Sequence, residues 1–91
     1  MIIDPRRNNC IIWFVNKSKR QSIVGTPEEC VDRIVKYATK NVMDKGTGKE
    51  ERLQWCKIRL DVTGSIGKLY ADYFREKGIK FDAVKFVTDV V

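Results

Sequence analysis

One segment near the middle of the chain constrains the fold more than any other, because an apolar stretch runs through a glycine-rich turn into a helical pattern. Residues 53–61 are typical of a β-strand, and the turn that follows reads Val62-Thr63-Gly64-Ser65-Ile66-Gly67. Residues 68–77 then carry apolar side chains at helical spacing, and Gly78 is well placed to end that helix. A strand that enters a helix through such a turn predicts an α/β fold.

The flanking sequence predicts the other elements. Polar turns separate three short strand candidates at residues 2–4, 10–15 and 20–24. Thr26-Pro27-Glu28-Glu29 is a typical helix start, and an apolar stripe continues the helix to near Asn41. Residues 44–51 hold two glycines among charged side chains, which predicts a mobile surface loop. A last strand is expected at residues 83–87.

The predicted order is therefore β-β-β-α-β-α-β, in a single α/β domain of residues 1–91. The first three strands are joined by short turns and should be antiparallel, whereas the later strands follow helices and should be parallel with right-handed crossovers. We expect a mixed sheet with helices on both faces.

Charge bears most directly on the choice of partner. The chain has 18 Lys and Arg residues against 12 Asp and Glu, a net charge of +6. This excess favours polyanions such as nucleic acid or an acidic protein surface, and it is equally compatible with a merely solubilising surface. The candidate nucleic-acid-binding residues are Arg6, Arg7, Lys17, Lys19, Arg20, Lys45, Lys49 and Lys68.

Several classes of protein do not fit this sequence. The longest apolar run, residues 10–15, is far shorter than the roughly 20 residues of a membrane span, and the N-terminus lacks a signal-peptide pattern. The three cysteines, Cys10, Cys30 and Cys56, have neither the pairing of a disulfide framework nor zinc-site spacing, and histidine is absent. We therefore expect buried thiols, a cytoplasmic location and no membrane partner.

The turn after Asp61 offers a phosphate site as one kind of chemistry. Its glycines and the following helix N-terminus can approach a phosphate. However, too few residues separate its glycines for a phosphate-binding loop, and Leu69 replaces the metal-binding Ser or Thr. We do not expect ATP or GTP binding.

A metal site is the second kind of chemistry. Asp4 ends the first predicted strand and Asp61 ends the fourth, so the two lie side by side if those strands are neighbours. Two adjacent carboxylates can hold Mg²⁺ or Mn²⁺ for phosphodiester cleavage. A purely structural role is also open, in which each aspartate caps a turn or Asp61 pairs with Arg59 on the same strand face.

These residues resemble a known family. Ile58-Arg59-Leu60-Asp61-Val62-Thr63-Gly64-Ser65-Ile66-Gly67, followed by residues 69–74 and Lys77-Gly78-Ile79, resembles the strand–turn–helix segment of the nuclease domain of phage terminase large subunits. Ile2-Ile3-Asp4-Pro5 resembles the first strand of ribonuclease H-like enzymes, including junction resolvases. The resemblance implies a viral, ribonuclease H-like domain in which Asp4 and Asp61 match the positions that ligate catalytic metal ions.

Two departures from the family pattern point away from catalysis. The family has a further acid after the last strand, for which only Asp82 or Asp89 is available, and Arg59 stands where some relatives carry the second acid. We therefore expect a small basic binding module with a degenerate ribonuclease H-like fold and no cofactor. It would bind nucleic acid, DNA rather than RNA, or a nucleoprotein complex, without cutting.

Three alternatives stay open. The first is a Mg²⁺- or Mn²⁺-dependent nuclease with Asp4 and Asp61 as catalytic metal ligands, completed by a partner chain. The second is a protein–protein effector that inhibits a host machine, because aromatic residues dominate interfaces; its candidate anchors are Tyr37, Trp55, Tyr70 and Tyr73. A homodimer through an exposed strand edge is also compatible with the pattern.

Overall fold

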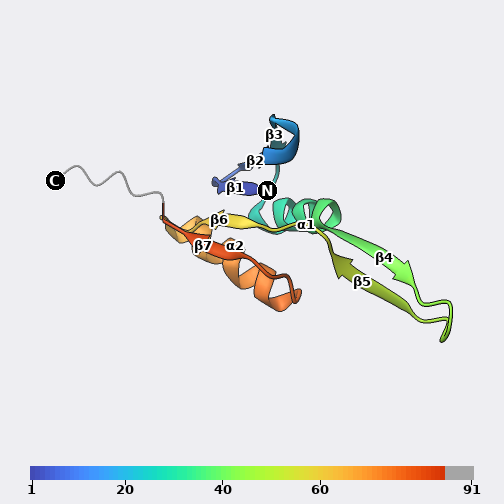
Figure 1. Ribbon diagram of the computed structural model, residues 1–91. Coiled ribbons are helices and arrows are strands. Elements are labelled where there is room, and N and C mark those ends of the chain that lie inside the picture. Colours follow the sequence, from blue (N-terminus) through green and yellow to red (C-terminus); the bar gives the residue numbers. More distant parts are fainter. Residues whose placement is uncertain (86–91) are drawn as a thin grey trace.

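Residues 1–85, which the computed structural model describes, form a five-stranded mixed sheet, a separate two-stranded hairpin and two α-helices (Figure 1). The strands are β1 (Ile2–Pro5), β2 (Asn9–Phe14), β3 (Lys19–Val24), β4 (Thr39–Met43), β5 (Glu50–Gln54), β6 (Arg59–Asp61) and β7 (Asp82–Val84). The helices are α1 (Pro27–Ala38) and α2 (Ser65–Glu76), and a short 3-10 helix, η1 (Val15–Lys17), joins β2 to β3.

The large sheet has the strand order β3-β2-β1-β6-β7. The pairs β1–β2 and β2–β3 are antiparallel, whereas β6 runs parallel to β1 and β7 runs parallel to β6. The predicted mixed α/β class is confirmed, and so are the directions of its strands.

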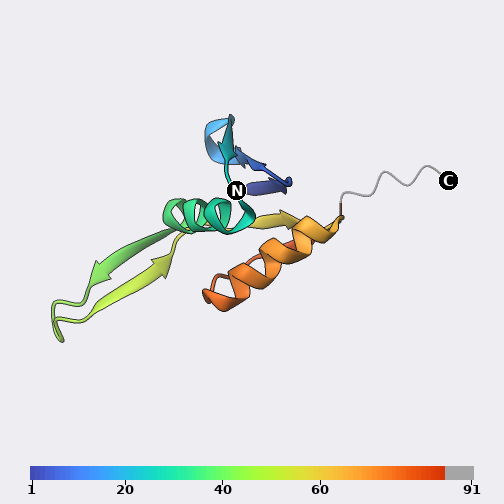
Figure 2. The same ribbon diagram turned by 180° about the vertical axis from the view of Figure 1, so that it is seen from behind.

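One face of this sheet carries the hydrophobic core. Ile3, Ile12 and Leu60 are neighbours across β2, β1 and β6, and each is fully buried. Both helices contribute to the same core, α1 through residues such as Ile34 and α2 through residues such as Phe74. Figures 1 and 2 show α1 and α2 on the same side of β1 and β2.

The prediction of helices on both faces is therefore wrong for the part of the chain that the structure describes. The apolar run at residues 10–15 was interpreted as a strand covered on both sides. In the fold, Trp13 is 45% exposed, although Ile11 on the same face of β2 is buried, and Val15 lies beyond β2 in η1. Because neighbouring residues of a strand face opposite sides, Ile12 enters the core while Trp13 lies on the other face.

Helix α1 begins where the capping pattern predicts. Thr26 accepts a hydrogen bond on its side chain from the Glu29 backbone N–H at 3.3 Å, and Pro27 occupies the first turn. The helix ends at Ala38 rather than near Asn41, because the chain continues directly into β4. The Thr39 hydroxyl donates to the carbonyl of Val35 at 2.7 Å and so helps to close the last turn.

An exposed turn is present at residues 44–49 of the loop predicted at residues 44–51, but it closes a β4–β5 hairpin that was not predicted. The strand predicted at residues 53–61 is divided between β5 and β6. The hairpin turn is closed by the Asp44 N–H, which donates to the Lys49 carbonyl at 2.9 Å, and Gly48 takes the left-handed conformation with φ +70°. The chain then bends at Cys56 before β6 begins. Figure 1 shows the hairpin extending away from the sheet and helices.

Helix α2 begins at Ser65, earlier than predicted, and stops at the predicted glycine. Gly78 has φ +69°, and the Ile79 N–H donates to the Phe74 carbonyl at 2.9 Å, which satisfies one of the last helical carbonyls. Strand β7 covers the beginning of the strand predicted at residues 83–87, and residues 86–91 lie outside the described residues. No helix within residues 1–85 combines the length and the apolar character that crossing a membrane requires.

Candidate functional site

Asp4 and Asp61 lie on neighbouring parallel strands. Ile2 of β1 pairs with Arg59 of β6 and Ile3 pairs with Leu60, so the same register carried one residue further brings Asp4 beside Asp61. Both aspartates line one shallow hollow together with Ile2 and Trp13. The structure thus brings together the two acids that the sequence singled out, on the face of the sheet that the helices leave uncovered.

Each aspartate has a local partner. Asp61 accepts hydrogen bonds through Oδ1 from the backbone N–H of Thr63, at 2.9 Å, and from the Thr63 hydroxyl. Asp4 forms an ion pair with Arg6 at 3.5 Å, and both of these side chains are well exposed. Asp61 therefore caps its turn through one oxygen, and hydrogen bonds among residues 1–85 leave its second oxygen, Oδ2, unused.

Arg59 does not bridge the two acids. It is exposed on β6 and, within the part of the chain that the structure describes, it forms no ion pair with either aspartate. Its cross-strand neighbours are Ile2 on β1 and Asp82 on β7. The predicted ion pair between Arg59 and Asp61 is thus not formed within residues 1–85.

The acid pair has no third carboxylate beside it among the described residues. Val84, not Asp82, is the β7 residue paired with Asp61. No group of three or more His, Cys, Asp or Glu side chains within residues 1–85 is arranged to hold a metal ion. Asp89, the other acid considered from the sequence, lies outside the described residues.

Gly67 fixes the position of the turn that carries Asp61. A Cβ atom added at Gly67 would collide with the backbone carbonyl of Asp61 and lie 2.7 Å from Cα of Val62. A Cβ added at Gly64 would meet nothing within 4 Å. Gly67 therefore lets the first turn of α2 pack directly on the end of β6, a contact within the protein that differs from the approach of a phosphate expected from the sequence.

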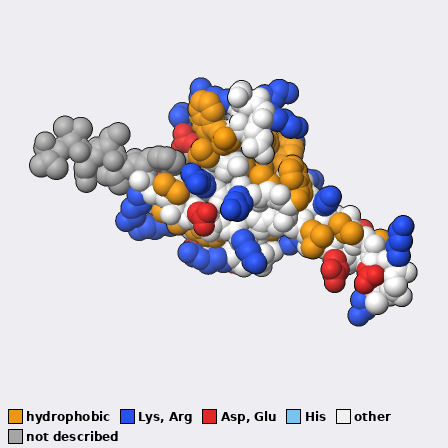
Figure 3. All heavy atoms as spheres, viewed as in Figure 1, with side chains coloured by type: hydrophobic (Ala, Val, Ile, Leu, Met, Phe, Trp, Pro, Cys, Tyr) orange, Lys and Arg blue, Asp and Glu red, His pale blue; other side chains and the backbone are white. Residues whose placement is uncertain are grey.

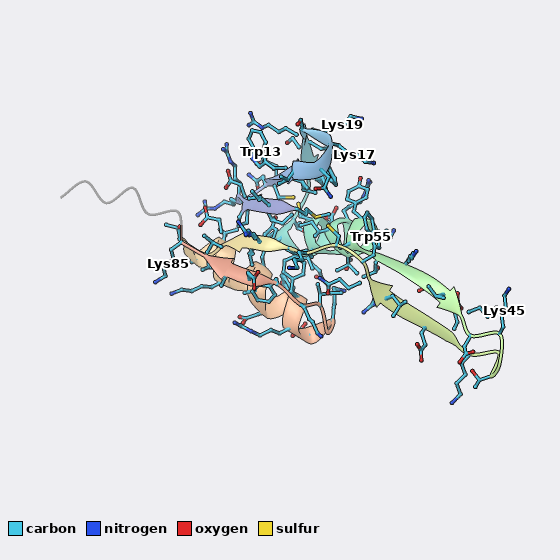
Figure 4. The ribbon with its side chains drawn as sticks, viewed as in Figure 1. Trp13, Lys17, Lys19, Lys45, Trp55 and Lys85 are labelled. Atoms are coloured by element: carbon cyan, nitrogen blue, oxygen red, sulfur yellow. The ribbon has the colours of Figure 1, made fainter. Side chains whose placement is uncertain are left out.

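The eight predicted basic residues are all exposed, but they lie in three separate places. They divide into a carboxyl-edge group of Arg6, Arg7 and Lys68, a β2–β3 group of Lys17, Lys19 and Arg20, and a hairpin-tip group of Lys45 and Lys49. The carboxyl-edge group is nearest the acids, because β1 and β6 are parallel and end at the same edge. Figure 4 labels members of the other two groups, with Lys17 and Lys19 beside β2 and β3 and Lys45 at the tip of the hairpin.

Trp13 is the site residue that the sequence did not single out. Its ring lies beside Arg20, whose guanidinium carbon is 5.2 Å from the ring centroid, and its side chain helps to line the hollow with the two acids. Its position on the open face depends on which side the helices cover, a long-range property. The sequence did contain one indication of a site at Trp13, because three basic residues, Lys17, Lys19 and Arg20, follow it closely in the chain.

The predicted aromatic anchors have different environments. Tyr70 is fully buried, and Tyr37 and Tyr73 pack partly against the core, whereas Trp55 is 61% exposed at the base of the hairpin (Figure 4). Tyr70 is thus a core residue and is excluded as an interface anchor.

The thiol of Cys10 is not activated as a nucleophile. All three cysteines are free thiols; Cys10 and Cys30 are buried, and Cys56 is half-buried. Burial raises the pKa of the Cys10 thiol to about 12 and also raises the pKa of the neighbouring Tyr70 hydroxyl. Cys10 is therefore protonated at neutral pH, in agreement with the prediction of buried structural thiols for this residue.

Comparisons of the chain with family models, with curated proteins and with solved structures found no significant match. Its function is therefore inferred from its own residues and their geometry.

Proposed function

We propose that this chain is a small binding module with a degenerate ribonuclease H-like fold, which binds nucleic acid without cutting it. With the β4–β5 hairpin set aside, its elements follow the order β-β-β-α-β-α-β on which the resemblance to ribonuclease H-like proteins rests. The resemblance of the Asp61 turn to terminase nuclease domains favours DNA over RNA and a viral origin. The free thiols favour the cytoplasm.

The observation that carries the proposal is the distribution of charge around the acid pair. Two-metal phosphodiester cleavage depends on carboxylates that fix both ions, and Asp4 has Arg6 as its ion-pair partner. The edge where β1 and β6 end also carries Arg7 and Lys68, both exposed. A basic edge attracts phosphates, while an acid pair without a third carboxylate among residues 1–85 is poorly equipped to hold two metal ions.

Fluorescence anisotropy with labelled single- and double-stranded DNA and RNA tests this proposal. We expect binding at micromolar protein that weakens steeply with salt, because each phosphate contact releases counterions. Replacing Arg6 and Arg7 by Gln should reduce the salt dependence. Replacing Lys45 and Lys49 by Gln removes the same charge at the hairpin tip and is the matched control. Absence of salt-sensitive binding to every probe would refute the proposal.

A metal-dependent nuclease is the second candidate, and the position of Asp4 beside Asp61 in one hollow favours it. In this function the two carboxylates would hold Mg²⁺ or Mn²⁺, and the ion would activate water and stabilise the leaving oxygen. Incubation of supercoiled plasmid with Mn²⁺ tests it, beside an Asp61→Ala control. If neither protein cuts, or both cut at the same rate, the intrinsic nuclease is excluded.

A further inference from the structure

The sheet has one face that is free of helices within residues 1–85, and its side chains form a defined surface. We call this surface the Trp13 face; it comprises Ile2, Asp4, Trp13, Arg20, Arg59 and Asp61. The register places Arg20, Trp13, Ile2 and Arg59 in one row across the adjacent strands β3, β2, β1 and β6, and the row ends at Asp82 on β7. An arginine thus lies on each side of the exposed tryptophan and its isoleucine neighbour.

Trp13 is held in place but not covered. Arg20 lies over its ring at 5.2 Å, a cation–π contact that restrains the indole, and Ile2 supports it from the neighbouring strand. With 45% of the residue still exposed, the indole keeps surface for a further planar group. A restrained, exposed aromatic ring beside a guanidinium group is suited to stacking with a nucleobase.

The charge around Trp13 indicates where the phosphates of such a ligand would lie. Arg20 pairs with Trp13 across β3 and β2, and Lys17 lies in η1, which joins these strands at the same end. Lys19 pairs with Phe14 and therefore lies on the other face of the sheet. Figure 3 shows hydrophobic side chains bordered by Lys and Arg at this end of the molecule, and Figure 4 labels Trp13 on one side of β2 and β3 and Lys19 on the other. The carboxylates of Asp4 and Asp61 lie on the other side of Trp13 and repel phosphates, so the phosphates nearest a stacked base would lie beside Arg20 and Lys17.

We propose that the Trp13 face binds single-stranded nucleic acid, with a base stacked on Trp13 and the adjacent phosphates held by Arg20 and Lys17. The inference rests on the proposed nucleic-acid binding. It adds that the ligand is single-stranded and that the Trp13 face is the surface that binds it. Single strands are preferred because the bases of a duplex are already stacked on one another, and only an unpaired base is free to cover the indole.

The chain offers a direct spectroscopic test, because it has two tryptophans, Trp13 and Trp55. In a Trp55→Phe variant, Trp13 is the only source of indole fluorescence. Titration with an unlabelled thymidine oligonucleotide should quench this fluorescence, whereas the same oligonucleotide in a duplex should quench it far less. The reciprocal Trp13→Phe variant, in which Trp55 alone fluoresces, should show little quenching with either probe.

Affinity measurements complete the test. Trp13→Leu should weaken binding to the single strand by about 5- to 150-fold, the range of one lost base–aromatic stack, and change duplex affinity less than about twofold. Trp13→Phe retains a ring and should lose less than Trp13→Leu, and Trp55→Leu should leave both affinities unchanged. Circular dichroism establishes that each variant is folded. If Trp13→Leu does not fold, the affinities of Trp13→Phe are compared with those of the parent chain in its place.

The possible failures can be told apart. Absence of salt-sensitive binding to any nucleic acid would refute the proposed function together with this inference. Salt-sensitive binding with equal affinity for single strand and duplex, unchanged in the folded Trp13 variant, would refute only the stacking surface. Equal weakening of both affinities by Trp13→Leu would also refute it, because stacking on Trp13 cannot serve an intact duplex.

Discussion

At the scale of single residues, the acid pair and the tryptophan beside it differ in how far the sequence reveals them. Asp4 and Asp61 were predicted as neighbours on the condition that their strands pair, and the parallel β1–β6 ladder meets that condition. Trp13 lies on the same surface through strand alternation. Its exposure could not be predicted, because residues 10–15 are apolar at nearly every position and do not themselves say which face the helices cover.

Gly67 is the residue whose replacement should most directly disturb the site. Gly67→Ala should lower the free energy of unfolding by about 1–3 kcal/mol, because the new methyl group must displace backbone atoms of Asp61 and Val62. Gly64→Ser is the matched control: its position is open, and a serine there can cap α2, so stability should be unchanged or slightly higher. Urea unfolding measures both. Equal stability of Gly67→Ala and the parent chain would contradict the packing described here.

The buried Cys10 and Tyr70 make stability sensitive to alkaline pH. Burial raises the pKa of Cys10 from 9.0 to about 12, and it raises the pKa of Tyr70. The unfolded thiol therefore loses its proton at a lower pH than the folded one. Its contribution to stability is complete below pH 9 and is lost as the pH rises towards 12.

We expect the free energy of unfolding, measured in guanidinium chloride with a reductant, to fall between pH 8 and pH 10.5. The fall per group approaches about 1.4 kcal/mol per pH unit where only the unfolded form is ionised. Cys10→Val keeps an apolar side chain of similar size and removes one of these groups, so its stability should fall less over the same range. An identical pH dependence in Cys10→Val would show that the Cys10 thiol does not contribute.

At the scale of elements, locally encoded features were predicted and the long-range ones were missed. The start of α1 and the end of α2 depend on residues a few positions apart, and Thr26 and Gly78 act there as the pattern predicts. The β4–β5 hairpin was missed because its strands are mostly exposed and lack an alternating apolar pattern. The break after β5 depends on Gln54, whose partners include a residue 26 positions away.

Gln54 fastens the hairpin to the segment before β7. Its amide nitrogen donates to the carbonyls of Cys56, at 3.0 Å, and Lys80, at 2.7 Å, and its amide oxygen accepts from the Lys80 N–H at 2.8 Å. Gln54→Ala should therefore destabilise the fold by about 1–3 kcal/mol and increase amide hydrogen exchange at the base of the hairpin and in β7.

Gln21→Ala provides the comparison for this prediction. Gln21 makes one exposed side-chain hydrogen bond, to the Tyr37 hydroxyl at 3.3 Å, and its loss should cost less than about 0.5 kcal/mol. Equal effects of the two substitutions, or faster exchange confined to residues 44–49, would mean that the three Gln54 bonds do not hold the hairpin.

At the scale of the whole molecule, the net charge of +6 is spread over basic groups in different parts of the fold. The β2–β3 group lies at the end of β2 that carries Trp13, the carboxyl-edge group borders the acids, and the hairpin-tip group lies far from both (Figure 4). Composition predicted the excess but not this separation, because the distance between Lys45 and Lys17 depends on a hairpin that the sequence did not reveal. Within this charge pattern, Asp4 and Asp61 are the residues for which the two candidate functions, binding without cleavage and metal-dependent cleavage, predict different effects of substitution.

Neutralising the acids should therefore have opposite effects under the two candidate functions. If the chain binds without cutting, Asp61→Asn removes a charge that repels phosphates, and affinity for DNA at low salt should rise about two- to fivefold with or without Mg²⁺. Asp72→Asn, on the exposed surface of α2, is the charge-matched control and should change affinity less. Anisotropy titrations in Mg²⁺ and in EDTA measure both variants. A loss of affinity in Asp61→Asn that occurs only in Mg²⁺ would instead identify Asp61 as a metal ligand, because the ion would then be what joins the carboxylate to the phosphate.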